Sequence, residues 1–251
     1  MSNMQQNRQF MQCHDLRSAI EKSDQVQGIE SPAPGNAVTG KLISLPPFTG
    51  IDKNRTYAEL LDIRRSIKAY EDKPISAEQL GFILWSAQGA QAYKNEKSRT
   101  GTFRPTPIGG GLHPFETYIA VKHVTGLTPG LYRYVPLENV GEKQVSLEMM
   151  GTLDDYENKI ATMLAGQKWV SKASAVLFFS CAPYRAEWRY GESAHRITLI
   201  GLGHVGQNVM LSAAAVGLGS CCLASYDQQL CDKTLGLDGV DEYTVYISAI
   251  G

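Results

Sequence analysis

The chain has 251 residues, 43% hydrophobic and 20% charged, a composition typical of globular proteins with a substantial core. Its 24 basic and 25 acidic residues nearly cancel, which argues against a protein that binds nucleic acid or an anionic membrane through its charge. No apolar run reaches the length of a membrane span, and the first ten residues lack the apolar core of a signal peptide. We therefore expect a cytoplasmic protein.

The five cysteines indicate neither a disulfide framework nor a metal site. Their number is odd, no two have the two-residue separation typical of zinc ligands, and no pair of histidines accompanies them. Cys181, Cys221 and Cys222 lie in apolar, strand-like runs. We expect these three to be core thiols.

The N-terminal part has little capacity for a domain of its own. Residues 1–20 can form a helix, but residues 24–41 contain three glycines and two prolines, which favour a loop or a surface arm. Pro46 and Pro47 then keep the next segment extended. We predict an N-terminal helix and extended arm over residues 1–42 and one domain over residues 43–251.

Two capping boxes mark the first helices of this domain. Thr56 and Glu59 stand at the start of one amphipathic run, and Ser76 and Gln79 stand at the start of another. In each pair, the two side chains reciprocally satisfy backbone N–H groups that a helix start leaves free. The sequence therefore predicts helices that begin directly after Thr56 and Ser76.

The first of these helices leads into the most informative stretch of the chain. In an extended conformation, Arg64, Ser66 and Lys68 would lie on one side and Arg65 on the other. Four residues of extended chain span roughly 13 Å, the reach from the phosphate to the ring of a mononucleotide cofactor. Arg and Ser suit a phosphate, and Lys suits a ring that becomes anionic. The alternative is a solvated basic patch at a helix C-terminus, where cations complement the dipole.

A second distinctive stretch is rich in proline and glycine. Residues 104–114 contain Pro105, Pro107 and three consecutive glycines from Gly109, which prevent regular structure but let a backbone approach a flat ligand closely. A flexible surface loop is the alternative. The polar residues 93–102 before it are predicted to form a loop.

The later sequence alternates strands and helices. We predict a hairpin of strands over residues 115–122 and 131–135, a helix over 154–165, a buried strand over 174–181 and a last strand over 242–250.

Gly201, Gly203 and Gly206 form a G-x-G-x-x-G pattern. A dinucleotide-binding fingerprint requires this pattern in the turn after a strand, with an acidic residue about 20 positions later. Instead, the surrounding apolar residues follow helical spacing over residues 196–216. We predict a long buried helix whose small residues allow close packing, with His204 buried or at an interface rather than a ligand.

Several of these motifs together resemble one known family. The stretch Arg64-Arg65-Ser66-Ile67-Lys68-Ala69-Tyr70 resembles the opening signature of the FMN-dependent nitroreductase family. Arg189-Tyr190-Gly191-Glu192, followed by Gly203-His204-Val205-Gly206-Gln207-Asn208, is similar to the corresponding part of its SagB-type dehydrogenase branch. The continuation Leu223-Ala224-Ser225-Tyr226-Asp227 also matches that branch, and the ordered motifs extend over roughly residues 43–251.

The resemblance implies an α+β fold in which helices flank a central, mostly antiparallel sheet. It also implies an intertwined homodimer with each flavin at the interface, and residues 196–216 are the candidate dimer core. Residues 43–251 would then be a nitroreductase-like flavin-binding domain that acts on a small-molecule substrate.

The resemblance also implies the residues of the site. Arg64, Arg65 and Ser66 would hold the FMN phosphate, and Lys68 would lie at the pyrimidine edge of the ring. Two further groups would face the flavin, mainly through their backbone: Pro107, Ile108, Gly109 and Gly110 in one, and Leu223, Ala224 and Ser225 in the other. Ile108 replaces a serine of the family pattern, so only the backbone role of that loop carries over.

Arg189 and Tyr190 are the candidate catalytic residues beyond the flavin. They replace a Lys-Tyr pair that some SagB-type members use in oxidising azolines, and arginine is a poor general base. Many nitroreductases continue past the position of Gly251 with basic residues, so more of the phosphate contact is expected from Arg64 and Ser66.

The resemblance thus implies an FMN-dependent oxidoreductase that transfers hydride or electrons between a reduced donor or small organic substrate and the flavin. NADH and NADPH are the candidate donors. The alternative is a flavin-binding protein of the same fold with a regulatory, non-catalytic role.

Overall fold

The computed structural model describes residues 3–12, 15–51 and 54–251. The strands of its main sheet are β1 (Lys41–Ser44), β4 (Phe115–Val121), β5 (Gly130–Tyr134), β6 (Ser146–Gly151), β7 (Ala175–Cys181), β8 (Ser220–Leu223) and β9 (Tyr243–Ile250). The helices are α1 (Asn3–Phe10), α2 (Leu16–Glu21), α3 (Tyr57–Ile63), α4 (Ala77–Gln88), α5 (Tyr156–Met163), α6 (Tyr184–Tyr190), α7 (Ala194–Ala215) and α8 (Gln228–Leu235).

The main sheet has seven strands in the order β1-β6-β5-β4-β7-β9-β8. Every neighbouring pair in it is antiparallel. The predicted hairpin is formed by β4 and β5, and the predicted buried strand is β7 in the middle of the sheet. The fold is therefore α+β, with helices flanking an antiparallel sheet, as predicted.

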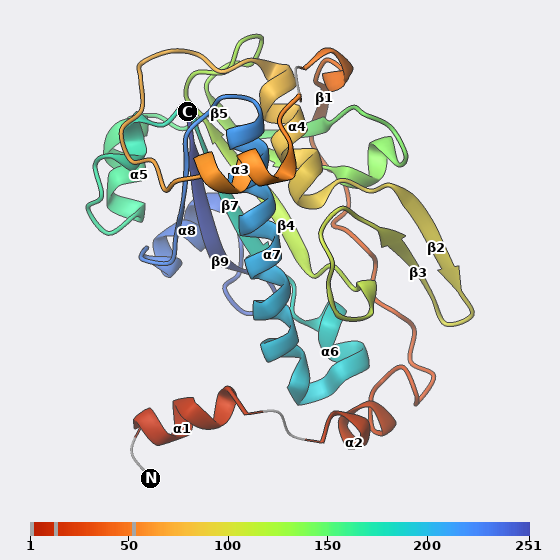
Figure 1. Ribbon diagram of the computed structural model, residues 1–251. Coiled ribbons are helices and arrows are strands. Elements are labelled where there is room, and N and C mark those ends of the chain that lie inside the picture. The colour runs from red at the N-terminus through yellow and green to blue at the C-terminus, as the bar shows by residue number, and fades with distance from the viewer. Residues whose placement is uncertain (1–2, 13–14, 52–53) are drawn as a thin grey trace.

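The two faces of the sheet carry separate hydrophobic clusters (Figure 1). Helices α4 and α7 pack on one face together with Leu177 and Phe179 of β7. Helices α5 and α8 pack on the other with Val176 and Phe178. Because consecutive side chains of a strand point to opposite faces, the continuous apolar run of β7 serves both clusters.

Helix α3 ends at Ile63, and the chain then continues extended. Both predicted capping boxes are present, at Thr56 and at Ser76. Arg64 leaves the helix with φ −56° and ψ 121°. Ser66 forms a parallel bridge with Ser220 at the start of β8. The extended conformation predicted after α3 is therefore confirmed.

The loop prediction for residues 93–102 is wrong. These residues lie in a two-stranded hairpin, β2 (Ala92–Glu96) and β3 (Arg99–Phe103). The hairpin stands beside the main sheet (Figure 1), and every residue of β2 is at least partly exposed. Exposure accounts for the polar side chains of β2, whereas Arg99 and Thr102 of β3 are polar but buried. An ion pair of 2.7 Å between Glu96 and Arg99 closes the hairpin.

The G-x-G-x-x-G pattern lies in the middle of α7, as predicted, and not in a turn after a strand. A Cβ on Gly201 would lie 2.7 Å from Ile108, and one on Gly206 would lie 2.6 Å from Tyr246, whereas one on Gly203 would meet nothing within 4 Å. His204 is exposed, with Nδ1 3.1 Å from the carbonyl oxygen of Pro107. Of the two positions predicted for it, the buried one is therefore wrong, and the one at an interface stays a prediction.

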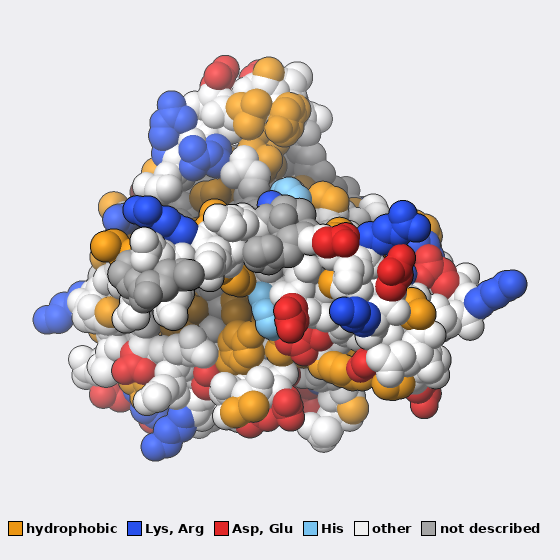
Figure 2. All heavy atoms as spheres, turned by 90° about the horizontal axis from the view of Figure 1, so that it is seen from below, with side chains coloured by type: hydrophobic (Ala, Val, Ile, Leu, Met, Phe, Trp, Pro, Cys, Tyr) orange, Lys and Arg blue, Asp and Glu red, His pale blue; other side chains and the backbone are white. Residues whose placement is uncertain are grey.

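Lys and Arg side chains are intermixed with Asp and Glu side chains on the face of the molecule shown in Figure 2. Within the described chain, no helix combines the length and apolar character needed to cross a membrane.

The N-terminal region contains two short helices, α1 and α2, in place of the single helix predicted over residues 1–20. Cys13 and His14, between these helices, lie outside the described residues. Residues 24–40 contain no helix or strand, as predicted for the arm.

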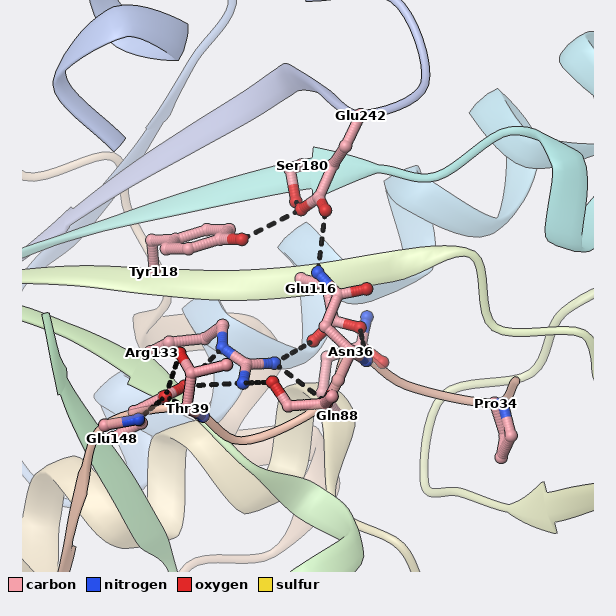
Figure 3. A network of polar contacts seen from close by, with 12 residues as sticks. Pro34, Asn36, Thr39, Gln88, Glu116, Tyr118, Arg133, Glu148, Ser180 and Glu242 are labelled. Atoms are coloured by element: carbon pink, nitrogen blue, oxygen red, sulfur yellow. Dashed lines mark hydrogen bonds and ion pairs between the residues drawn. The ribbon is translucent and has the colours of Figure 1, made fainter. Parts of the chain in front are cut away.

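A buried network of charged side chains binds the backbone of this arm (Figure 3). The backbone N–H of Thr39 donates to Glu148 over 2.6 Å, and Arg133 donates to the carbonyl oxygen of Ala37 over 2.7 Å. Glu116 accepts from the backbone N–H of Asn36 over 2.9 Å. Glu116, Arg133 and Glu148 are all buried. The charged side chains interact with one another and form hydrogen bonds with the backbone of the arm. Buried charged groups require such partners.

Candidate functional site

The structure places the predicted basic residues beside the start of β8. Ile67 N–H donates to the carbonyl oxygen of Ser220 over 2.9 Å, so the extended chain after α3 runs alongside β8. Leu223 ends that strand and is buried, and Ala224 and Ser225 follow it in an exposed loop. We call residues 64–68 and 223–225 the cationic group.

Its cations have no acidic partner among the described residues. In the described parts of the chain, Arg64, Arg65 and Lys68 take part in no ion pair with a carboxylate. Arg64 Nη1 lies 3.9 Å from the sulfur of Met210 on α7, and Arg65 Nη1 donates to the carbonyl oxygen of Arg64 over 2.8 Å. Lys68 Nζ lies 5.4 Å from the ring centroid of Trp169. The positive charges thus remain available to an external anion.

Cys221 lies beside the cationic group, although the sequence indicated only a core thiol. The residue is buried, beside Ser66 and close to the charge of Lys68. Burial raises the pKa of its thiol, and Lys68 and Ser66 oppose that rise. Consecutive side chains of a strand point to opposite faces, so Cys221 and Cys222 in β8 do not share one environment. This alternation is the sequence signal that could have distinguished the two cysteines.

The proline- and glycine-rich stretch forms a second group, at the other end of α7. Gly109–Gly111 make a short 3-10 turn in which Gly110 has φ 64° and Gly111 has φ 65°, a left-handed conformation that favours glycine. A Cβ on Gly109 would collide with Ile197, and one on Gly110 would lie 2.8 Å from the hydroxyl oxygen of Tyr190. Only glycine, which has no side chain, therefore fits at positions 109 and 110. We call residues 107–110, with Arg189 and Tyr190, the loop group.

The hairpin supports the loop group, a role that the sequence did not reveal. Arg99 of β3 donates through its guanidinium to the carbonyl oxygens of Gly110 and, over 3.5 Å, Gly111. The same guanidinium pairs with Glu96. The turn is therefore fixed by a buried cation.

Arg189 and Tyr190 end α6 next to the turn. Tyr190 is buried. Arg189 donates through Nη1 to the side-chain oxygen of Gln25 over 2.5 Å, and its Nε is buried without a partner in the described chain. Because arginine does not deprotonate at ordinary pH, Arg189 can orient or attract a negatively polarised group but cannot serve as a general base.

One chain does not bring the two groups into contact. Gly201 and His204 of α7 contact Ile108 and Pro107, whereas Met210 contacts Arg64. Nine residues of helix correspond to about 14 Å of rise. On the N-terminal side of both contacts, Leu199 and Ile200 are 50% and 51% exposed, so α7 also presents an exposed apolar surface near the loop group.

Comparison with known proteins identifies the family. Residues 61–251 match the Nitroreductase family. The nitroreductase homologue MJ1384 of Methanocaldococcus jannaschii is 26% identical over 194 residues, which cover 77% of this chain and 89% of that protein. The microcin B17-processing protein McbC of Escherichia coli is 25% identical over 139 residues, which cover 54% of this chain and 49% of McbC.

Solved structures share the fold. A nitroreductase homologue from Anabaena variabilis superposes on the whole chain with a TM-score of 0.72 at 19% identity, and the chain spans 46% of its length. A nitroreductase homologue from Desulfovibrio desulfuricans in complex with FMN superposes on 77% of this chain with a TM-score of 0.50 at 18% identity, covering 84% of that protein. The family match spans most of the chain, and the similarity to McbC supports the SagB-type branch: the chain belongs to the nitroreductase family.

Proposed function

We propose that the protein is an FMN-dependent oxidoreductase of the SagB-type branch that acts on a small organic molecule. The observation that carries the proposal is the cationic group, in which Arg64, Ser66 and Lys68 follow one another in extended chain without an acidic partner among the described residues. Family membership and the FMN complex of the Desulfovibrio relative support the same cofactor.

The residues fit the cofactor in two respects. Among the described residues, the half-buried Arg64 and the exposed Arg65 and Lys68 have no carboxylate partner, which suits a phosphate and an electron-rich ring edge. The turn at Gly109 and Gly110 presents a backbone without side chains of its own. FMN would supply the hydride or electron transfer, which no side chain of the protein can provide.

Each group would then have a defined task. Arg64 and Ser66 would bind the phosphate, with Arg65 contributing charge nearby, and Lys68 would stabilise negative charge at the pyrimidine edge of the ring. The backbone at Leu223, Ala224 and Ser225 and at Pro107, Ile108, Gly109 and Gly110 would face the ring. Arg189, fixed by Gln25, and Tyr190 would orient the substrate. NADH or NADPH would serve as the electron donor.

The separation of the two groups along α7 supports a homodimer. The exposed Leu199 and Ile200 and the open space over Gly203 provide a surface on which a second α7 can pack. In that arrangement the cationic group of one protomer would meet the loop group of the other. The flavin would lie at the interface, as the family resemblance implies.

FMN affinity of two neighbouring arginine variants tests the proposal. Arg64→Ala should weaken FMN binding by roughly 10- to 150-fold, because a hydrogen bond to a charged group contributes about 1.5–3 kcal/mol. Arg65→Ala, the matched control, should change it much less, because an exposed charge contributes about 0–1 kcal/mol. Titration of the apoprotein with FMN gives both values.

Two results would contradict the proposal. Equal FMN affinity in the two variants would return residues 64–68 to a solvated basic patch. A purified protein that is colourless and does not bind added FMN would exclude any flavin function. Bleaching of the yellow protein by NADH or NADPH would identify the donor and separate the enzyme from a flavin-binding protein without catalytic activity.

A further inference from the structure

A tight turn follows α5 and brings its end to the cationic group. The backbone of Ala165 and Gly166 has φ 54° and φ 79°, and the N–H of Gly166 donates to the carbonyl oxygen of Ala161 over 2.8 Å. Gln167 N–H donates to Leu164 over 3.1 Å. These bonds close the helix and fix the direction in which Gln167 and Trp169 leave it.

Trp169 lies against the basic stretch. Its ring stacks on Tyr70, with centroids 6.2 Å apart and an interplanar angle of 27°, and Lys68 Nζ lies 5.4 Å from its centroid. The hydroxyl of Tyr70 donates to the carbonyl oxygen of Ile67 over 2.9 Å and lies 3.3 Å from that of Ala249 on β9. The indole is therefore attached to the sheet, and Lys68 is held against a fixed aromatic surface.

Gln167 contacts the other part of the cationic group. Its side-chain amide donates to the carbonyl oxygen of Ser225 over 3.0 Å. Two residues further on, Asp227 N–H donates to the carbonyl oxygen of Met163 over 2.8 Å. The end of α5 and its turn thus hold the loop after β8, and one short segment contacts both Lys68 and Ser225.

We infer that residues 165–169 form a further wall of the flavin site, in which Trp169 is a positioning residue for Lys68 and Gln167 for Ser225. The inference rests on the proposed function. An indole face attracts an ammonium group without carrying a formal charge. A carboxylate in the same place would hold Lys68 equally well but would neutralise it. Trp169 therefore orients the ammonium and leaves its charge available to the ligand.

The reduction potential of bound FMN tests this role. Lys68→Met removes the ammonium that would stabilise negative charge on the reduced ring and should lower the midpoint potential. Trp169→Leu removes the indole ring and should lower the potential toward that of Lys68→Met, because the ammonium is no longer fixed. It should also weaken FMN binding about two- to fivefold, the size expected for one exposed cation–π contact. Trp169→Phe keeps an aromatic face and should remain close to the wild type.

A double-mutant cycle separates positioning from packing. In the Lys68→Met background, Trp169→Leu should cause no further change in potential, because its effect acts through the ammonium. An equal drop in both backgrounds, or an unchanged potential in the single variant, would overturn the inference while FMN binding and the proposed function stand. If the leucine variant does not fold, Trp169→Met, which also lacks the aromatic face, gives the same comparison in the two backgrounds. A wild-type protein that binds no FMN would overturn both.

Discussion

Gly203 offers a direct test of the proposed dimer, because the single chain places no constraint on it. A Cβ at this position meets nothing within 4 Å, and the residue is exposed on α7 beside Leu199 and Ile200. Gly203→Leu should therefore fold as a single chain. In a helix interior, leucine is more favourable than glycine by up to about 1 kcal/mol.

The expected cost appears only when two copies meet. Overpacking of a close contact costs about 1–3 kcal/mol per site, and a two-fold interface presents the same residue twice. The dimer should therefore lose roughly 2–6 kcal/mol, which raises its dissociation constant about 30-fold or more. Gly203→Ala adds one methyl group and should have a smaller effect in the same direction.

Sedimentation equilibrium over a range of protein concentrations measures these constants, and FMN titration follows the site in the same samples. We expect Gly203→Leu to shift the protein to monomers and to lose FMN together with the dimer. A wild-type protein that is a stable monomer with bound FMN would refute the reasoning. So would a leucine variant whose dimerisation is unchanged.

Two further substitutions test the loop group and the buried network. Gly109→Ala should weaken FMN binding without unfolding the protein, because its Cβ would collide with Ile197. The control variant is Gly50→Ala, whose Cβ would meet nothing within 4 Å. It should change neither FMN affinity in a titration nor the temperature of thermal unfolding. Burial opposes the charge of Glu148, but the N–H groups of Thr39 and Gly40 and the guanidinium of Arg133 hold its pKa at about 2. Its contribution to stability is then fully present above the ordinary pKa of 4.5 and is lost as the pH falls toward 2. Glu148→Gln should cost about 3–5 kcal/mol at neutral pH and should flatten the pH dependence of urea unfolding below pH 4.5; a variant with the wild-type acid profile would contradict this assignment.

Local rules predicted the parts of the fold that depend on local interactions. The capping boxes at Thr56 and Ser76 form within four residues, so their partners could be identified in the sequence. The extended conformation after Ile63 was one of two alternatives that the spacing left open, and the resemblance to the family favoured it over a basic patch at a helix end. The hairpin at residues 92–103 was missed because β2 is exposed and the buried residues of β3 are Arg99, Gly101 and Thr102, so neither strand shows an apolar alternation.

The buried network could not be predicted, because its partners are far apart in the sequence. Glu148 accepts from Thr39, 109 residues earlier, and Arg133 donates to Ala37, 96 residues earlier. Charged residues within strands ordinarily indicate an exposed face. Here the arm covers these charged residues, which are therefore buried. The sequence signal for the network was that charged residues occupy strand positions otherwise held by apolar side chains. Trp169 and Gln167 were missed for the same reason, since their contacts with Lys68 and Ser225 are made only in the folded chain.

The position of Gly203 near the middle of α7 explains how a dimer would complete the site. Around a two-fold axis close to this residue, antiparallel copies of the helix would place residue 210 of one protomer opposite residue 197 of the other. Arg64 contacts Met210, and Gly109 approaches Ile197. The cationic group of one chain would then face the loop group of its partner, and each dimer would contain two composite sites.

Mixed dimers test this arrangement. Arg64→Ala and Gly109→Ala chains each form homodimers in which both sites are impaired. After dissociation and random reassociation, half of the dimers are mixed, and each has one site with both substitutions and one with neither. FMN titration should therefore recover about a quarter of the wild-type high-affinity sites. If Arg64 and Gly109 instead served the same chain, every site in the mixture would carry one substitution, and no high-affinity sites would return.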